Sequence, residues 1–347
     1  MIPIRNVYYM LSYAFQTLRE QGYRDVATEE FRNVADLCAA ILAKGVAAQI
    51  KRGLTREYLE RAETLACPRG RIDFSESVKT LCRRERRLAC VYDDFSVNCY
   101  MNRIIRTAMG LLLRADIARE RKKALRKLLV FFDGVEPLDP RFIDWHMRFN
   151  RNNQAYRMLV AVCYLTVKGL LQTTSEGGSR VMDFLDEQNM CRLYEKFLLE
   201  YYRKEFPRLS AKAAQIRWAL DGDAPPMLPL MLTDVTLQYG SDVLIIDAKY
   251  YNRTTQALYG SHVLHSGNLY QIFSYVKNKE AELAGRPHTV AGMLLYARTD
   301  AEVQPDADFS VSGNRFAVKT LDLNREFSEI AAQLDAIAQE YLHCEKG

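Results

Sequence analysis

The amino-acid sequence predicts an α/β protein, α+β overall, in which a mainly helical N-terminal domain with short strands precedes a domain built on a mixed sheet. Two observations support this fold class. Apolar residues recur at helical spacing through most of the first half. From Val181 the pattern changes to helix, strands, helix, strands and helix, which is typical of an α/β domain. At 347 residues the chain is long enough for two domains, each with its own core.

Helices are expected wherever the first half repeats apolar residues every three to four positions. Four ranges do so: Val7–Glu20, Glu29–Lys51, Tyr100–Phe132 and Asn153–Leu171. Over Leu54–Asp73 the pattern loosens to alternation, which predicts short strands with a turn. Leu88–Val97 predicts another strand, broken by Asp93 and Asp94.

A linker is expected at Thr173–Ser179, which contains two glycines and no apolar residue. We therefore predict a first domain over residues 1–175 and a second over residues 180–347. The second domain should contain an amphipathic helix around Cys191–Tyr202, strands over Met231–Tyr239 and Asp242–Lys249, a helix over His265–Ala284, strands over Val290–Tyr296 and Arg315–Leu321, and a closing helix over Phe327–Leu342.

The hairpin in the second domain contains the candidate site. Its apolar run Val243–Ile246 leads directly into Asp247-Ala248-Lys249. Because side chains alternate along a strand, Asp247 and Lys249 should share one face, and the tight turn should return Asp234 to their side. Two carboxylates and an ammonium at a strand end suit a hard divalent cation beside an activated water.

Each of these residues also has an ordinary structural interpretation. An Asp and a Lys two positions apart at a strand end are commonly a solvated surface ion pair. Gln271 and Tyr275 lie four apart on one helical face, which also fits an aromatic packing surface. Glu195 fits a solvated charge on an amphipathic helix. Only their combination favours a catalytic site.

Composition narrows the class of protein. A hydrophobic content of 48% and a charged content of 26% are typical of a globular chain. No apolar run is long enough to span a bilayer, and no signal-peptide pattern is present at the start. The eight cysteines are scattered without a C-x-x-C pair, which argues against a zinc knuckle or a disulfide framework and favours a reducing cytoplasm.

Positive charge is concentrated in the first half, although the net charge is only +5. One basic cluster is Arg83–Arg87 and another is Arg114–Lys127. Either is a solvated helix face or a surface for a phosphate backbone or an acidic partner. No phosphate-binding loop of the type G-x-x-x-x-G-K-[ST] occurs, and the five histidines lack metal-ligand spacing.

The acid, turn and apolar strand ending in Asp-x-Lys resemble the PD-(D/E)XK nuclease core. Thr233-Asp234 stands in place of the first motif and Asp247-Ala248-Lys249 forms the second. Gln271 and Tyr275, in a Gln-x-x-x-Tyr pattern after the second motif, are similar to a subset of this superfamily. Members often draw a further acid from the helix preceding the sheet, where Glu195 is better placed than Glu200.

The N-terminus resembles a narrower group. Ile2–Ala14 looks like the opening of McrC proteins, the nuclease subunits of modification-dependent McrBC restriction systems. Further matches are Gly70–Asp73, the segment from Tyr92 to Arg103, and the nuclease core itself, so that the resemblance covers essentially the whole chain. It implies that residues 1–175 bind a separate AAA+ GTPase ring, McrB, and that residues 180–347 are a PD-(D/E)XK endonuclease domain.

The resemblance also implies a chemistry, the Mg²⁺-dependent hydrolysis of double-stranded DNA, with Mn²⁺ as a substitute in vitro. Asp234, Asp247, the Ala248 carbonyl and Glu195 would hold the cation, Lys249 would act on the water or the phosphate, and Gln271 and Tyr275 would support the site. Two other functions remain open from the residues, a non-cleaving adaptor that activates an AAA+ partner and a stand-alone DNA repair nuclease.

Overall fold

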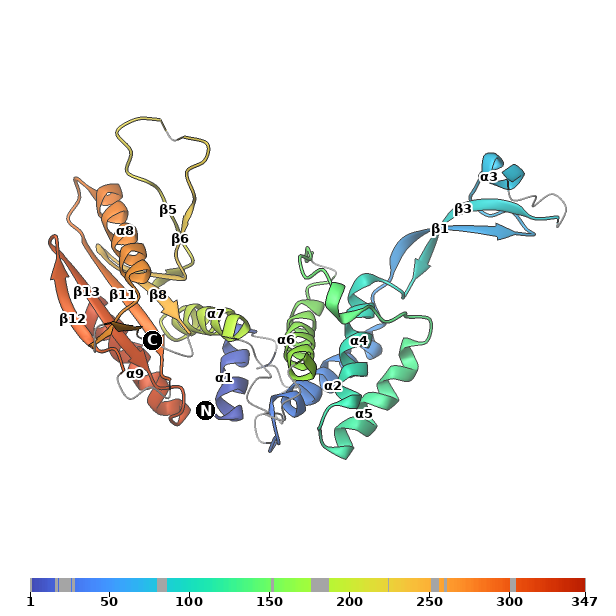
Figure 1. The fold of residues 1–347 in the computed structure, drawn as a ribbon, viewed down its shortest axis with the longest axis horizontal. Coiled ribbons are helices and arrows are strands. Elements are labelled where there is room, and N and C mark those ends of the chain that lie inside the picture. The colour runs from blue at the N-terminus through green and yellow to red at the C-terminus, as the bar shows by residue number, and fades with distance from the viewer. Residues whose placement is uncertain are drawn as a thin grey trace. The chain divides into compact units, whose positions relative to one another are not determined.

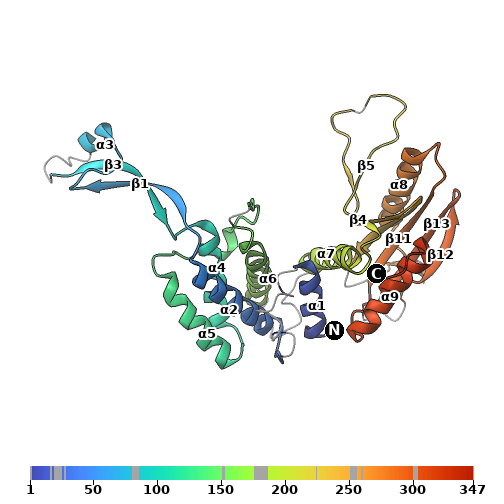
Figure 2. The same ribbon diagram turned by 180° about the vertical axis from the view of Figure 1, so that it is seen from behind.

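The computed structural model describes residues 2–15, 18, 26, 29–79, 86–150, 153–175, 187–223, 225–250, 256–258, 261–299 and 304–346. The chain forms two compact units (Figures 1 and 2). Unit 1 combines Met1–Thr28 with Leu185–Gly347, and unit 2 is Glu29–Phe184. The expected domain boundary between residues 175 and 180 lies close to the observed one, but the first 28 residues belong to the C-terminal unit.

The N-terminal helix α1 (Ile4–Ala14) joins unit 1 through specific contacts. It packs on α7 (Glu187–Glu205). The buried Asn6 side chain donates hydrogen bonds to the backbone carbonyls of Leu323 and Arg325 at 2.8 and 2.7 Å. The expected helix over Val7–Glu20 is therefore shorter and starts earlier, ending where Phe15 turns extended with φ of −135°.

The core of unit 1 is a six-stranded mixed sheet in the order β12-β13-β11-β8-β7-β4. Three central strands run parallel, and the others pair antiparallel with their neighbours. The sheet comprises β4 (Ser210–Lys212), β7 (Val235–Tyr239), β8 (Asp242–Lys249), β11 (Thr289–Ala297), β12 (Ala307–Val311) and β13 (Asn314–Leu321). This mixed sheet confirms the expected fold class, although the sequence pattern did not predict its outer strands β4 and β12.

Helices cover both faces of this sheet (Figure 1). On one face α8 (Ser266–Leu283) buries Ile272 and Val276 against Ile245 and Leu294. On the other face α7 and α9 (Phe327–Leu342) pack together, and the Tyr202 hydroxyl of α7 donates to a backbone carbonyl of α9 at 3.1 Å. Odd-numbered residues of β8 and even-numbered residues of β11 and β13 therefore face α8.

Two small sheets accompany the main one. The first pairs β5 (Gln215–Ile216) with β6 (Met231–Leu232), and the described residues 217–223 and 225–230 lie in the loop between them. The second pairs β9 (Gln256–Leu258) with β10 (Ser261–Val263). The main sheet and its helices therefore account for the core of unit 1.

Unit 2 is mainly helical, as expected. Its helices are α2 (Val34–Arg52), α3 (Phe74–Lys79), α4 (Tyr100–Arg114), α5 (Arg119–Leu129) and α6 (Tyr156–Ser175), with two 3-10 turns, η4 (Val130–Phe132) and η5 (Pro140–Phe142). The Asn33 side chain caps α2 by accepting the N–H of Asp36 at 2.9 Å, which fixes where that helix begins. Helix α6 extends to Ser175 and so includes the beginning of the predicted linker. The rest of the predicted linker lies outside the described residues.

A three-stranded antiparallel sheet, in the order β1-β3-β2, belongs to the same unit. Its strands are β1 (Glu57–Leu65), β2 (Arg71–Ile72) and β3 (Leu88–Ser96). The expected break at Asp93 and Asp94 is wrong, because both pair in register with β1. Arg61 of β1 also forms an ion pair with Asp94 at 3.0 Å, so the cross-strand ladder accommodates the two acids.

Helix α8 packs tightly on the sheet at Gly292 of β11. A Cβ placed there would lie 2.7 Å from Val276 Cγ2 and 2.9 Å from Ile272 Cγ1, closer than carbon atoms approach. Gly292→Ala is therefore expected to destabilise the protein by roughly 1–3 kcal/mol through overpacking. Urea unfolding would measure this change. The control Gly267→Ala, in α8 with open space around it, should remain within about 1 kcal/mol of wild type.

Candidate active site

The candidate site lies where the start of β7 pairs with the end of β8 in an antiparallel hairpin. Val235 pairs with Ile246 in the antiparallel ladder, which places Asp234 beside Asp247. The first strand is not continuous, since the chain leaves β6 at Leu232 and enters β7 only at Val235. In this interruption the Asp234 side chain turns to β8 and accepts the N–H of Ala248 at 2.8 Å.

Thr233 occupies the place where the nuclease motif has proline, and its hydroxyl has a structural role. It is 3% exposed. The hydroxyl accepts the N–H of Ala214 at 3.0 Å and lies 2.8 Å from the Thr236 hydroxyl. These contacts hold the chain on the N-terminal side of Asp234, so the departure from proline leaves that carboxylate in position.

Asp247 and Lys249 lie on the α8 side of the sheet, as strand alternation predicted. Asp247 is 2% exposed, and the Nζ atom of Lys249 lies 2.7 Å from its Oδ2 atom. A carboxylate oxygen can accept more than one contact, so the buried Oδ2 atom retains acceptor capacity beyond this ion pair among the described residues.

A chain of hydrogen bonds then connects Lys249 to α8 and back to the sheet. The ammonium of Lys249 donates to Gln271 Oε1 at 3.2 Å, and Gln271 Nε2 donates to the Tyr275 hydroxyl at 2.8 Å. That hydroxyl donates to the backbone carbonyl of Leu232 at 2.9 Å. Gln271 and Tyr275 thus orient the lysine. The role of the Leu232 carbonyl as the last acceptor could not be predicted from the sequence pattern.

Glu195 approaches the site from α7. Its Oε1 atom accepts a hydrogen bond from the Cys191 thiol, one helical turn earlier, at 3.1 Å. Burial raises the pKa of Cys191 to about 12, so its thiol stays protonated and can donate. Cys191 is a neighbour that the sequence did not indicate, although a spacing of four residues on a helix is the signal that could have found it. Glu200 instead pairs with Arg203 at 2.8 Å.

The carboxylates have raised affinities for protons. Burial raises the pKa of Asp234 to about 7, and the negative charges of Asp247 and Glu195 act in the same direction. Burial also raises the pKa of Asp247, against the opposing charge of Lys249. Two neighbouring buried carboxylates therefore need more positive charge than the single ammonium of Lys249 to be stable in their ionised forms.

A divalent cation would supply this additional positive charge. Mg²⁺ is commonly held by one or two carboxylates with waters and substrate phosphate oxygens completing its shell. Asp234 and Asp247 supply two such carboxylates, and the Oδ2 atom of Asp247 has acceptor capacity. Within the described ranges no three or more His, Cys, Asp or Glu side chains gather closely enough to hold an ion. The side chains therefore fit a two-carboxylate site, with Glu195 nearby rather than joined to it.

The fold and the acid, acid and lysine arrangement together define a nuclease-like protein. The chain also matches the family described as McrBC 5-methylcytosine restriction system component over residues 4–297. That match covers most of its length, so the chain belongs to this family. It is 28% identical to the Escherichia coli (strain K12) type IV methyl-directed restriction enzyme EcoKMcrBC, over 98% of each chain.

A solved structure shows a similar fold. The chain is similar, with a TM-score of 0.50 and 18% identity, to a chain of the Thermococcus gammatolerans assembly of McrB AAA+ hexamers with bound McrC, covering 96% of this chain and 76% of that one. A second structure of the Thermococcus gammatolerans McrBC complex is 20% identical with a TM-score of 0.40, over 62% of this chain and 60% of that one.

The basic clusters belong to unit 2, whereas the candidate site is built from residues of unit 1. Arg83 and Arg84 lie outside the described residues, and Arg86 and Arg87 are exposed. In the second cluster Arg121 is only 16% exposed and pairs with Glu29 at 3.1 Å, so it is structural. No helix in the described part of the chain is long and apolar enough to cross a membrane.

The raised pKa of Asp234 predicts a dependence of stability on pH in the metal-free protein. An acid whose pKa is higher in the folded chain than in the unfolded chain binds more protons when folded. The free energy of unfolding should therefore fall as the pH rises from about 4 through about 7. Asp234→Asn should flatten this slope, measured by urea unfolding in chelator.

A matched control is Asp308→Asn in the same unit. Hydrogen bonds from Lys319, Tyr341 and Arg315 outweigh the effect of burial and lower the pKa of Asp308 to about 2. Asp308 is therefore ionised in the folded and unfolded chains between pH 5 and 8, and its substitution should leave the slope unchanged. An unaltered slope in Asp234→Asn would contradict the assignment of the titration to Asp234.

Proposed function

We propose that this chain is the endonuclease subunit of a modification-dependent, methylcytosine-directed restriction system and hydrolyses phosphodiesters of double-stranded DNA with Mg²⁺. The observation that carries the proposal is the convergence of Asp234, Asp247 and Lys249 at one sheet edge, buried and tied together by the Ala248 N–H and the ion pair. Membership of the restriction family supports the choice of DNA as substrate.

The side chains divide the work. Asp234 and Asp247 would hold Mg²⁺, and the Ala248 carbonyl would supply a further oxygen ligand. When bound, the cation lowers the pKa of a water ligand and offsets negative charge on the phosphate. Lys249 orients the attacking water or stabilises the charge of the transition state from the same face. Glu195 acts through water from α7, since its carboxylate is engaged by Cys191.

Gln271 and Tyr275 act on the lysine. Their hydrogen bonds hold the Lys249 ammonium between Asp247 and the α8 helix, so a flexible side chain reaches the phosphate in one orientation. Tyr275 is 7% exposed and accordingly supports the site from within the core.

An AAA+ GTPase ring of the McrB type is the proposed partner. McrC in the similar Thermococcus gammatolerans structure is bound to McrB AAA+ hexamers. This chain has no phosphate-binding loop of its own, so a nucleotide motor must come from another protein. Unit 2 supports the interaction because it exposes the aromatic pair Tyr58 and Phe95, which are 73% and 51% accessible with ring centroids 4.9 Å apart.

Substitution at the site tests the proposal. Asp247→Ala and Lys249→Ala should each reduce cleavage of methylated DNA by roughly 100-fold or more, because each removes charge that acts on the transition state. The assay contains the AAA+ partner, GTP and Mg²⁺. Both variants should still stimulate GTP hydrolysis, and Lys212→Ala, an exposed lysine of β4, should cleave as wild type does.

Three results would contradict this assignment. Full cleavage by both variants would show that the site lies elsewhere. Stimulation of GTP hydrolysis by wild-type protein without cleavage of any DNA would identify an adaptor, and cleavage without a motor would identify a stand-alone nuclease.

Metal binding provides an independent readout. Isothermal titration with Mg²⁺ or Mn²⁺ should detect a site whose affinity falls at least about tenfold in Asp234→Asn and Asp247→Asn, since each loses an anionic ligand. Glu195→Gln should weaken binding less, because Glu195 is not part of the two-carboxylate cluster. Equal losses in all three variants would place Glu195 among the ligands.

A further inference from the structure

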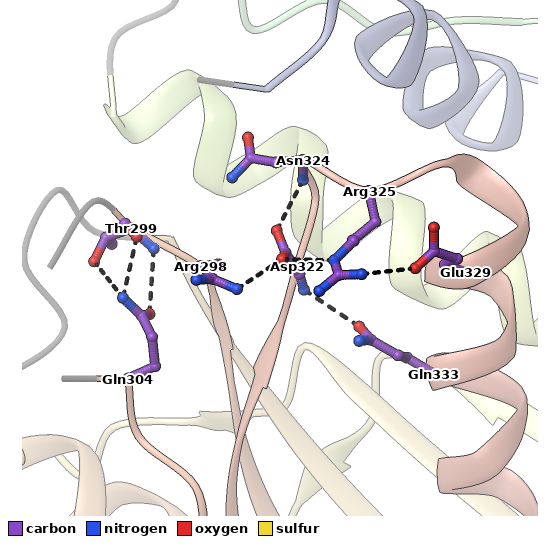
Figure 3. Close-up of polar contacts among 8 residues, drawn as sticks. All are labelled: Arg298, Thr299, Gln304, Asp322, Asn324, Arg325, Glu329 and Gln333. Atoms are coloured by element: carbon purple, nitrogen blue, oxygen red, sulfur yellow. Dashed lines mark hydrogen bonds and ion pairs between the residues drawn. The ribbon is translucent and has the colours of Figure 1, made fainter. Parts of the chain in front are cut away.

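A second polar cluster lies at the same edge of the sheet as the candidate active site, and its centre is Asp322 (Figure 3). This side chain follows β13 and is 12% exposed. It accepts from Nη1 of Arg298 at 2.8 Å, from Nε of Arg325 at 3.3 Å and from the N–H of Asn324 at 3.1 Å. One nearly buried carboxylate therefore holds two arginines.

Strand register relates this cluster to the site. Tyr296 of β11 pairs with Lys249 of β8, and Ala297 pairs with Leu321 of β13. The pairing continues one residue beyond, since the N–H of Arg298 donates to the Leu321 carbonyl at 2.9 Å. Arg298 thus lies one strand across from Lys249 and two residues further along the strand direction.

The separation and the common strand end both favour a shared substrate. One strand spacing and two residue rises place the Cα atoms of Arg298 and Lys249 about 8 Å apart. Arg298 follows the last residue of β11 directly, at the sheet end where β8 ends in Lys249. With one phosphate per about 3.4 Å of helix axis in each strand, this distance corresponds to two or three nucleotides.

The ion pair with Asp322 holds Arg298 in place and leaves part of its guanidinium available for another anion. Its side chain is 46% exposed, so part of the guanidinium faces solvent. Arg325 shares Asp322 and also pairs with Glu329 at 3.0 Å, so Asp322 neutralises neither arginine fully. Among the described residues Asp322 is the one carboxylate on Arg298. An ion pair that only stabilised the strand ends would not need a half-exposed guanidinium, so the exposure of Arg298 favours a binding role.

The backbone on either side is fixed as well. Gln304 donates to the carbonyl of Thr299 at 3.0 Å, immediately after Arg298. The N–H of Asp322 donates to Gln333 of α9 at 3.3 Å, and Asn6 holds the 323–325 turn from α1. A guanidinium anchored in this way loses little entropy on binding and presents a fork that matches phosphate oxygens.

We propose that Arg298, oriented by Asp322 and Arg325, binds a backbone phosphate of the DNA two or three nucleotides from the scissile bond. The inference rests on the proposed nuclease function and extends its substrate-binding surface from β8 to β11. Arg298 is a phosphate-binding residue, and Asp322 and Arg325 are positioning residues.

The test uses the full chain with its AAA+ partner, GTP, Mg²⁺ and methylated DNA. Arg298→Ala should lower kcat/KM for DNA about five- to tenfold, mainly through KM. The slope of log kcat/KM against log salt concentration should become shallower by about 0.9, because one phosphate contact is lost. Arg298→Lys keeps the ion pair and the charge, so it should retain most of the slope with an intermediate KM.

The matched control is Arg315→Ala. Arg315 is similarly exposed, at 41%, and pairs with Asp308 at 2.9 Å, but it lies at the opposite end of β13. This variant should keep the wild-type KM and salt slope. GTP hydrolysis should be unchanged in every variant, since partner binding is not involved.

The outcomes separate the inference from the function. A wild-type salt slope in Arg298→Ala, with or without a lower Tm, overturns the inference and leaves the nuclease function intact. A wild-type protein that cleaves no DNA with Mg²⁺ overturns the proposed function and this inference together. A shallower slope in Arg298→Ala but not in Arg315→Ala supports both.

Discussion

The pairing of β7 with β8 is the constraint on which the site depends. Its register places Asp234 opposite Asp247, and the Ala248 N–H then binds the Asp234 carboxylate across the interruption between β6 and β7. A slip of one residue would turn Asp247 and Lys249 to the opposite face, toward α7 and α9. This slip is disfavoured because it would place both charged side chains on the face where Leu244 and Ile246 are fully buried.

The same arrangement explains the electrostatic character of the site. Two buried carboxylates oppose one another, as their raised proton affinities indicate, and a single ammonium compensates them only in part. Gln271 and Tyr275 of α8 bind that ammonium through a chain of hydrogen bonds that ends at the carbonyl of Leu232, two residues before Asp234. Contacts from both the sheet and α8 therefore hold the acids and the lysine in place.

Local pattern predicted what depends on local geometry. The hairpin, the shared face of Asp247 and Lys249, the helix after β10 and the bounds of α9 all follow from periods of two or 3.6 residues. Contacts between distant segments leave no such pattern in the sequence. Examples are the packing of α1 on α7 and the pairing of Asp93 and Asp94 with β1. The contact of the Cys191 thiol with Glu195 is local, but it too was identified only in the structure. Asp322 and its arginines were missed for the same reason, since three separate segments supply them.

The position of α1 has a consequence for how the protein is made. Unit 2 is one uninterrupted segment, Glu29–Phe184, whereas unit 1 is built from both ends of the chain. During synthesis α1 leaves the ribosome before unit 2, and the turn that Asn6 binds leaves after it. Because domains generally fold as units as they emerge, unit 2 can fold before α1 has made its contacts. Unit 1 can therefore complete its fold only after the helical unit has already formed.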